Sequence, residues 1–406
     1  MQIPVKISTH NFKAFIWHAA FLALAQSFMD VDTVIPAMLV EAGGNAFHIG
    51  LMTAILMGGS SFTQLFFAPF ISNRPYKKGI LLIGINARVL ALISLGLILF
   101  YLSGQHSGII LYLIFALISL FALGGAFANI AYVDIVGKSI NAEKRKRFFS
   151  LRQIIIGVAV LVSAFAAKQI ITSRAFPVNY AYTFLIGGVL LLTASGGFWS
   201  IKEHVSSHMK ISSLTDFFRV MKTEIKQNEK LIYFLGFINT QGIAISFLPF
   251  VVLYAKTMFN ADSADTGNFL FNKIIGVVLV SVFVLIFSGK VKYKYMLITN
   301  VILSVLLASL VLFINDLVAI RYLFIIGGII FSLYNISMNG VLLEVSGNEN
   351  RALYAGFAGA GNILPAVFPL LGGWLIQKMG FATFFGLFIV IVISSLYFIR
   401  KMNCQK

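Results

Sequence analysis

The sequence predicts an all-α membrane protein with twelve transmembrane helices in two six-helix pseudo-repeats. Composition is the first reason: 59% of the 406 residues are hydrophobic, only 11% are charged, and the mean hydropathy is +0.92. Soluble domains are about half apolar and about a quarter charged. Second, apolar runs of about 20 residues, the length that crosses a bilayer core, recur along the whole chain. Third, the two halves of the chain contain matching segments. A water-soluble globular fold is therefore excluded.

Twelve apolar runs define the expected helices. They cover residues 14–40, 47–71, 79–102, 109–137, 149–171, 180–201, 231–256, 267–288, 296–314, 318–342, 352–378 and 381–399. None shows the sustained two-residue alternation of a barrel strand, and a backbone in lipid must satisfy its own hydrogen bonds, so each run is expected to be helical. The first run contains two aspartates and lacks a cleavage site of small residues, which indicates a retained helix rather than a signal peptide.

The distribution of basic residues predicts the orientation in the membrane. The net charge is +17 and the isoelectric point is about 9.9. Lysine and arginine concentrate at the N-terminus, in alternate loops, in the central polar stretch and in the tail, whereas the loops on the other side are close to neutral. The positive-inside rule therefore places both termini in the cytoplasm of a multi-pass protein in the cell (inner) membrane. Because topology accounts for the basic excess, we expect contacts with membrane lipids and no nucleic-acid partner.

A polar stretch in the middle of the chain predicts the domain organisation. Residues 1–201 form the expected N-terminal six-helix bundle, residues 202–230 a cytoplasmic central loop, and residues 231–406 the C-terminal bundle with a short cytoplasmic tail. Within the loop, apolar residues recur at helical spacing among lysines; these are Leu214, Phe217, Phe218, Met221 and Ile225. This pattern predicts a short amphipathic helix on the inner membrane surface. A linker with helical propensity is the alternative.

The segments after the fourth and tenth runs indicate an internal repeat. Aligned without gaps, they pair identical residues: Asn129 with Asn335, Glu143 with Glu349, and Arg145 with Arg351. The loops after the second and eighth runs also correspond as short basic turns. Parallel six-helix repeats about an axis along the membrane normal occur in one large class of transporters, whose substrate site lies between the halves near the membrane midplane.

With these features the chain resembles the major facilitator superfamily over essentially its full length. That family has two six-helix halves, a cytoplasmic central loop and a basic loop between the second and third helices with the pattern G-x-L-a-D-R-x-G-R-K. Here the stretch matches at three basic positions and departs at three others: Arg74, Lys77 and Lys78 match, whereas Asn73 replaces the aspartate, and Pro69 and Tyr76 replace the glycines. The fifth helix lacks the glycine-proline signature of drug/proton antiporters, which disfavours a standard multidrug antiporter.

Ionisable residues within the apolar runs are the first candidates for function, because a bare charge in the bilayer core costs roughly 2.5 to 3.5 kcal/mol. On a helical wheel Asp30 shares a small or polar stripe with Gln26, whereas Asp32 lies on the opposite side. We expect Asp30 to face the cavity and to carry the coupling proton. The alternative is that Asp30 or Asp32 pairs with Arg88 or Lys273 as a structural ion pair.

The two cations in the apolar runs have different expected roles. Lys273 is expected to hold an anionic group of the substrate or to alternate with Asp30 as a charge partner, and reaching to the outer surface is the alternative. Arg88 lies in the third run, and third helices are peripheral in the resembled family. A structural ion pair, or a side chain that reaches to the inner surface, is therefore expected for Arg88 rather than contact with substrate.

Uncharged polar residues complete the predicted substrate- and ion-binding set. With Asp30, Asp32 and Lys273, this set contains Gln26, Gln64, Asn129, Asn239, Gln241, Asn335, Asn339 and Asn362. Most lie on the first, fourth, seventh and tenth helices or their neighbours, which line the central cavity in the resembled family. Since amides are costly to bury against lipid, together they predict a wet cavity of mixed polarity. Each one is equally suited to an interhelical hydrogen bond.

Charged residues near the predicted cytoplasmic ends of helices suggest an inner gate. The resemblance implies acidic and basic pairs after the fourth and tenth helices, and the expected gate residues are Arg74, Asp134, Glu143, Arg145, Glu344, Glu349 and Arg351. Solvated loop charges that contribute almost nothing are the alternative.

No enzyme site competes with a transport function. The 6 histidines are scattered without an H-E-x-x-H motif and the single cysteine is Cys404, so we expect no metal and no cofactor. The prediction is a secondary active transporter, expected to be a monomer, that moves a small organic solute by alternating access with a proton as the coupling ion. A lipid or lysolipid flippase or amphiphile exporter is the alternative. A non-transporting membrane sensor or assembly partner is the alternative of another class.

Overall fold

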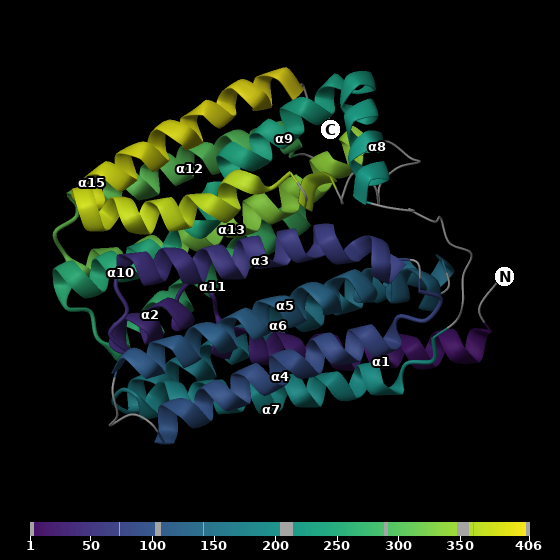
Figure 1. The fold of residues 1–406 in the computed structure, drawn as a ribbon, viewed down its shortest axis with the longest axis horizontal. Coiled ribbons are helices and arrows are strands. Elements are labelled where there is room, and N and C mark those ends of the chain that lie inside the picture. The colour runs from purple at the N-terminus through teal and green to yellow at the C-terminus, as the bar shows by residue number, and fades with distance from the viewer. Residues whose placement is uncertain are drawn as a thin grey trace. The chain divides into compact units, whose positions relative to one another are not determined.

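The computed structural model describes residues 4–72, 74–101, 107–140, 142–203, 214–287, 291–346, 357–359 and 361–402. All regular elements in these ranges are helices (Figure 1). In the first half they are α1 (Val5–Gln26), the 3₁₀ turn η1 (Ser27–Met29), α2 (Val34–Glu41), α3 (Ala46–Ser72), α4 (Lys78–Tyr101), α5 (Ser107–Ser139), α6 (Ala142–Ser173) and α7 (Val178–Ser200). The second half contains α8 (Leu214–Gln227), α9 (Glu229–Gln241), the 3₁₀ turn η2 (Gly242–Ser246), α10 (Leu248–Phe259), α11 (Ser263–Phe287), α12 (Tyr293–Phe313), α13 (Leu317–Ser346) and α15 (Ile363–Met402). The predicted fold class is confirmed, and α8 lies where the amphipathic helix of the central loop was expected.

Helix lengths agree with twelve membrane crossings. Within the described residues, 10 stretches are long and apolar enough to span a bilayer, and α3 contains a further, shorter apolar helix at Ala46–Gly59. The 40 residues of α15 would extend about 60 Å as one helix, twice the thickness of a bilayer core. Gly380, with φ of 83°, interrupts α15 between the two apolar runs predicted there. Glycine adopts this left-handed backbone at no steric cost, so the chain reverses at this point.

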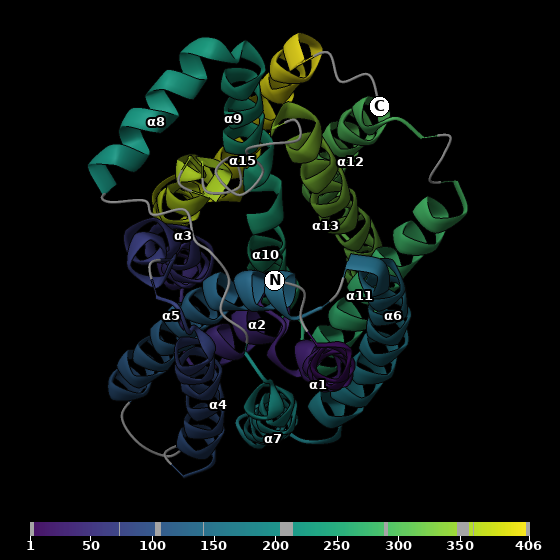
Figure 2. The same ribbon diagram turned by 90° about the vertical axis from the view of Figure 1, so that its right-hand side faces the viewer.

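One compact unit of the chain consists of Met1–Asp30 and Phe62–Phe217. Within it, α7 contacts both α4 and α1, α5 packs on α4, and α6 packs on α1 (Figure 2). Glycines permit these close approaches. A Cβ atom on Gly84 of α4 would lie 2.6 Å from the carbonyl oxygen of Gly124 in α5, and one on Gly197 of α7 would lie 2.5 Å from that of Ala14 in α1.

A second compact unit consists of Val31–Ser61 and Phe218–Lys406. The segment Val31–Ser61, which the sequence assigns to the N-terminal bundle, groups here with the C-terminal helices. α2 packs on α10 and α11, and Gly50 of α3 lies against the carbonyl of Pro369 in α15. The physical reason lies in the first predicted span, which is interrupted just before Val31, so its two parts pack separately.

The first and seventh predicted spans are both interrupted near their middle. In the first, η1 is followed by Asp30 in extended conformation, and helix resumes only at Val34. In the seventh, α9 passes through η2 before α10 begins. A proline follows each interruption, Pro36 in α2 and Pro249 at the start of α10. Proline has no N–H to donate to the carbonyl four residues earlier, but it is tolerated in a first helical turn, so both residues suit a restarted helix.

The contact between α11 and α13 provides a test of glycine-dependent packing. A Cβ atom on Gly276 would lie 2.1 Å from the carbonyl oxygen of Ile325, whereas one on Gly386 in α15 would meet no atom within 4 Å. We predict that Gly276→Ala lowers the free energy of unfolding by about 1–3 kcal/mol, because the two backbones must separate. Gly386→Ala is the matched control and raises stability by up to about 1 kcal/mol through helix propensity. Thermal unfolding in detergent measures both, and equal stability of the two variants would contradict the packing described.

Candidate functional site

A buried ion pair lies at the interruption of the first span. The Nζ of Lys273 in α11 is 2.6 Å from Oδ2 of Asp32, and the two side chains are only 4% and 2% exposed. The Lys273 cation also lies 5.3 Å from the centre of the Phe331 ring in α13, within range of a cation–π attraction. Lys273 is therefore buried rather than extended to the surface, and of the alternatives open in the sequence, its partner is Asp32.

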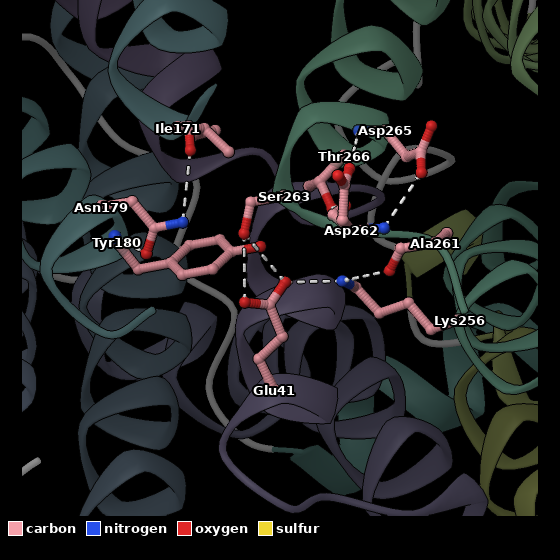
Figure 3. Close-up of polar contacts among 10 residues, drawn as sticks. All are labelled: Glu41, Ile171, Asn179, Tyr180, Lys256, Ala261, Asp262, Ser263, Asp265 and Thr266. Carbon is pink, nitrogen blue, oxygen red and sulfur yellow. Dashed lines mark hydrogen bonds and ion pairs between the residues drawn. The ribbon is translucent and has the colours of Figure 1, made fainter. Parts of the chain in front are cut away.

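A second charged network links α2 to the α10–α11 region of the same unit (Figure 3). Glu41, the last residue of α2, lies 2.5 Å from Nζ of Lys256 in α10. The Ser263 hydroxyl donates to the same carboxylate at 3.2 Å, and Lys256 also donates to the carbonyl of Ala261. With the pair of Asp32 and Lys273, this network fastens the segment Val31–Ser61 to the C-terminal helices at two points.

Local sequence explains why Ser263 and its neighbours hold this position. Asp262 accepts a hydrogen bond from the N–H of Asp265, and Asp265 accepts one from the N–H of Asp262, both at 2.9 Å. This reciprocal arrangement is a capping box, which fixes the first turn of α11. Asp265 also accepts from Nε of Arg321 in α13 at 2.6 Å. The capping box and the contact with Arg321 together fix the start of α11, and this places Ser263 beside Glu41.

The unit Met1–Asp30 with Phe62–Phe217 contains a cavity of about 220 Å³. Its polar lining comes from α1, α4, α5 and α6 and consists of His18, Gln26, Arg88, Asn129, Tyr132 and Arg152. The apolar lining comes mainly from alanine, leucine and isoleucine side chains of the same helices, with Phe198 of α7. Among the described lining residues none is acidic. A pocket of this kind, mostly apolar with a few convergent polar groups, is typical of a ligand site.

Arg88 projects into this cavity from α4. Gly124 and Gly125 of α5 lie beside its side chain, and the guanidinium carbon is 4.3 Å from the centre of the Phe121 ring. Its Nε is buried without a hydrogen-bond partner, and within the described part of the chain no carboxylate pairs with it. The structural ion pair, or the side chain that reaches the inner surface, expected for Arg88 therefore stays a prediction. Close packing of α4 on α5, through glycines, brings Arg88 to the cavity although its helix was expected to be peripheral.

Arg152 of α6 is the second cation of the cavity. It hydrogen bonds to the Tyr132 hydroxyl, while its own Nε is buried without a partner. His18 of α1 completes this wall: its ring stacks on Phe198 with 3.6 Å between centroids, and Nδ1 lies 3.1 Å from the carbonyl of Ala194. A nitrogen facing a carbonyl carries the proton, so the contact sets the tautomer of His18.

Gln241, predicted as a binding residue, instead holds three helices together. It is fully buried in α9 and donates to Asn300 and to Ser304 of α12, the latter at 3.1 Å. Its Oε1 accepts from Ser395 of α15. Sequence reasoning left open whether each amide binds ligand or links helices, and for Gln241 the contacts are interhelical.

Three other predicted amides bond to backbone groups. Asn239 donates to the carbonyl of Gly361 and accepts the N–H of Leu364, which fixes the start of α15 against α9. Asn335 and Asn339 each donate to the carbonyl four residues earlier in α13. Their roles as ligands stay predictions.

The remaining predicted residues have four different placements. Gln26 and Asn129 line the cavity, and Asp30 is buried at the interruption of the first span. The Oδ1 of Asn362 is buried without a hydrogen-bond partner in the described part of the chain, and the Gln64 side chain lies outside that part.

Of the predicted inner gate, two residues can be located. Arg74 is exposed between α3 and α4, and Glu344 lies in α13 with an intermediate exposure. The side chains of Asp134, Glu143 and Arg145, and the whole of Glu349 and Arg351, lie outside the described residues. The gate stays a prediction.

Sequence reasoning missed four residues of these sites. Arg152 lies close to a run of basic residues that the positive-inside rule uses to identify a cytoplasmic loop, so it was assigned to that loop. His18 was one of several scattered histidines, and Glu41 and Lys256 were outer loop charges. Their opposite signs, at the ends of the first and seventh spans, are the signal that would have suggested the pairing of Glu41 with Lys256.

Interrupted helical spans with buried charges and a polar cavity define a class of protein, the helical membrane carriers of small solutes. The chain belongs to the Major Facilitator Superfamily, whose family model matches residues 16–362. The resemblance inferred from the repeats and the basic loop is therefore confirmed. A search of curated protein sequences finds no match.

Solved structures of transporters share the fold. The nucleoside transporter NupG matches with a TM-score of 0.65 at 13% identity, over 97% of this chain and 98% of that one. A D-xylose–proton symporter matches with a TM-score of 0.62 at 15% identity, over 97% and 96% of the two chains. A bacterial homologue of the human lysosomal transporter Spinster, inward-facing and unoccupied, matches with 0.64 at 10% identity over 98% of both. At these identities the likeness establishes the fold of a membrane transporter.

The pair of Asp32 and Lys273 predicts strong energetic coupling. Removing one partner takes the ion-pair contact away from a buried charge, so Asp32→Ala and Lys273→Ala should each cost about 3–5 kcal/mol of unfolding free energy. The double variant should cost less than the sum by about 0.5–3 kcal/mol. The matched control is the pair of Asp265 and Arg321, whose arginine side chain is 33% exposed and whose coupling should be smaller. A double-mutant cycle of thermal stability in detergent measures both, and additive single effects at Asp32 and Lys273 would refute the coupling.

Proposed function

We propose that the protein is a secondary active transporter that moves a small organic solute across the inner membrane by alternating access, with a proton as the coupling ion. Both termini are cytoplasmic in this proposal. Its main support is the pair of matching interruptions in the first and seventh spans, with the buried ion pair of Asp32 and Lys273 at the first. Interrupted spans at corresponding positions of two repeats indicate the binding region of secondary transporters.

The segment Val31–Ser61 is the proposed moving element. This segment begins at the interruption of the first span, ends within α3, and packs with the C-terminal helices. The contacts of Asp32 with Lys273 and of Glu41 with Lys256 hold it there. We propose that this segment separates from the C-terminal helices during the transport cycle, and that its separation requires both ion pairs to break.

Protonation of Asp32 is the proposed trigger. A proton on this carboxylate removes its charge and therefore weakens its ion pair with the buried Lys273 cation, a pair that is worth most in a low-dielectric site. The protonated state therefore favours the arrangement in which Lys273 reaches water or another anion. Asp30, buried two residues earlier, is the second candidate for proton binding. Asp32 is preferred because its ion pair ties the proton to the moving segment.

The test is transport in proteoliposomes that contain the full chain. Counterflow with a panel of organic solutes, with and without a pH gradient, should reveal a substrate that the gradient accumulates. We predict that Asp32→Asn abolishes accumulation driven by the gradient while exchange of substrate across the membrane persists, because the amide cannot release a proton.

Asp316→Asn is the matched control. Asp316 caps the first turn of α13 on the exposed surface, and asparagine also caps helices well, so accumulation should stay unchanged. Accumulation that persists in Asp32→Asn would refute coupling through Asp32. Absence of counterflow for every solute in the panel would contradict the transport function itself.

A further inference from the structure

We propose that the cavity lined by Arg88 and Arg152 binds the oxyanion of a small organic anion, a carboxylate or a phosphate, and that this anion is the transported solute. The inference rests on the proposed transport function and adds the charge class of the substrate. Sequence reasoning had treated Arg88 as structural and Arg152 as a loop cation, so neither was a candidate ligand of the substrate.

The charge balance of the cavity is the first reason to expect an anion there. Two arginines line it, and among its described lining residues there is no aspartate or glutamate. Neither guanidinium forms an ion pair with a described carboxylate. Cations within membrane helices face a large desolvation cost and are usually paired or placed along a substrate path. A monoanion in the cavity would balance one of these charges and a dianion both, which gives the site a strong preference for negative solutes.

Unused hydrogen-bond donors are the second reason to expect an anion in the cavity. The Nε atoms of Arg88 and Arg152 are buried and have no hydrogen-bond partner within the described chain. An unsatisfied charged donor is costly, and a bound acceptor would remove that cost. A guanidinium presents its N–H groups as a planar fork that matches two oxygens of a carboxylate or phosphate. The two arginines therefore offer forks from α4 and from α6 to one small cavity.

Both forks are held in place by other contacts. The Phe121 ring lies under the guanidinium of Arg88, and Gly125 leaves room beside it. Tyr132 of α5 hydrogen bonds to Arg152. Since aromatic and hydroxyl partners fix the arginines without cancelling their charge, the positive potential stays available for a ligand. Pre-positioned donors of this kind reduce the ordering cost of binding.

Cavity size and the rest of the lining define the body of the anion. A volume of about 220 Å³ is below the range of roughly 300–1,000 Å³ that holds drug-sized ligands, so the part of the solute that the cavity holds is compact. Leu22, Ile85 and Ile156 provide an apolar wall, and Gln26 and Asn129 provide amides. This lining fits a compact anion with an apolar or hydroxylated body.

Binding and counterflow by the full chain test the site. The probes are monocarboxylates, dicarboxylates and sugar phosphates, with uncharged sugars and nucleosides for comparison, in phosphatidylcholine vesicles with and without phosphatidic acid. Arg88→Gln and Arg152→Gln should each weaken anion affinity about 30-fold or more, the loss typical of an unpaired buried charge contact. Arg88→Lys keeps the charge but loses the fork, and should weaken affinity less than Arg88→Gln. A purely structural role would leave the affinity of a folded Arg88→Lys variant unchanged.

Arg174→Gln is the matched control, because Arg174 lies over the Tyr182 ring and does not line the cavity; its anion affinity should match the unmodified protein. Counterflow of an uncharged solute that Arg88→Gln and Arg152→Gln leave unchanged would overturn the anion site while the transport proposal stands. Binding of an anion that depends on both arginines, without counterflow, would support the site and contradict transport. Competition by phosphatidic acid but by no soluble anion would assign the oxyanion to a lipid headgroup and overturn the small solute.

Discussion

An ionised side chain inside a bilayer needs an opposite charge or a polar cavity, because hydrocarbon supplies neither water nor counter-ions. The described charges of this protein meet that requirement in two different ways. Asp32 with Lys273 is a buried ion pair, and Glu41 with Lys256 is a partly buried one, so each charge has an opposite charge beside it. Arg88 and Arg152 instead share a cavity and have no described carboxylate partner. The ion pairs connect elements of the fold, whereas the two arginines are the proposed ligand-binding groups. This difference separates the proposed moving contacts from the proposed binding site.

Interruptions in the first and seventh spans make these arrangements possible. A continuous helix buries its own backbone hydrogen bonds and resists bending, but a break exposes backbone groups and permits the two parts to pack against different neighbours. In the first span the break precedes Val31, and the part that follows packs with α10 and α11. Pro36 and Pro249 each follow a break within the first helical turn, so the same device occurs in both repeats. A segment held by ion pairs beyond a break can be released without unfolding the helix before it.

The sequence predicts the helices well because their length is a direct consequence of bilayer thickness. Each of the twelve apolar runs lies, to within one residue at its end, inside a described helix or a span across one of the two breaks, apart from the part of 352–378 outside the described residues. The site was harder to predict. The helical wheel that put Asp30 and Asp32 on opposite sides assumed a continuous helix, and the extended backbone at Asp30 removes that premise. Pro36 lies inside the first predicted span and indicates an irregular helix there. Pro249 indicates a second interruption only when its position is compared with that of Pro36.

Cavity residues escaped prediction for a related reason: their neighbours in space come from other helices. Arg88 approaches α5 only because Gly84 and Gly124 let two backbones touch, which no periodicity within one helix reveals. Arg152 lies close to a basic run that topology alone explains. Conversely, the sequence indicated Gln241 as a substrate-binding residue, but its side chain hydrogen bonds to Asn300, Ser304 and Ser395. Charge and polarity in a sequence identify groups that need partners, and packing decides which partners they receive.

Release of the segment Val31–Ser61 on protonation is the central claim, and a distance measurement tests it most directly. Spin labels at Phe47→Cys and Met258→Cys, both exposed positions, would report the separation of this segment from the end of α10 once Cys404 is replaced by serine. The account predicts one short distance at neutral pH and a second, longer distance that grows on acidification and dominates in Asp32→Asn. A single distance that neither acidification nor Asp32→Asn changes would contradict the account.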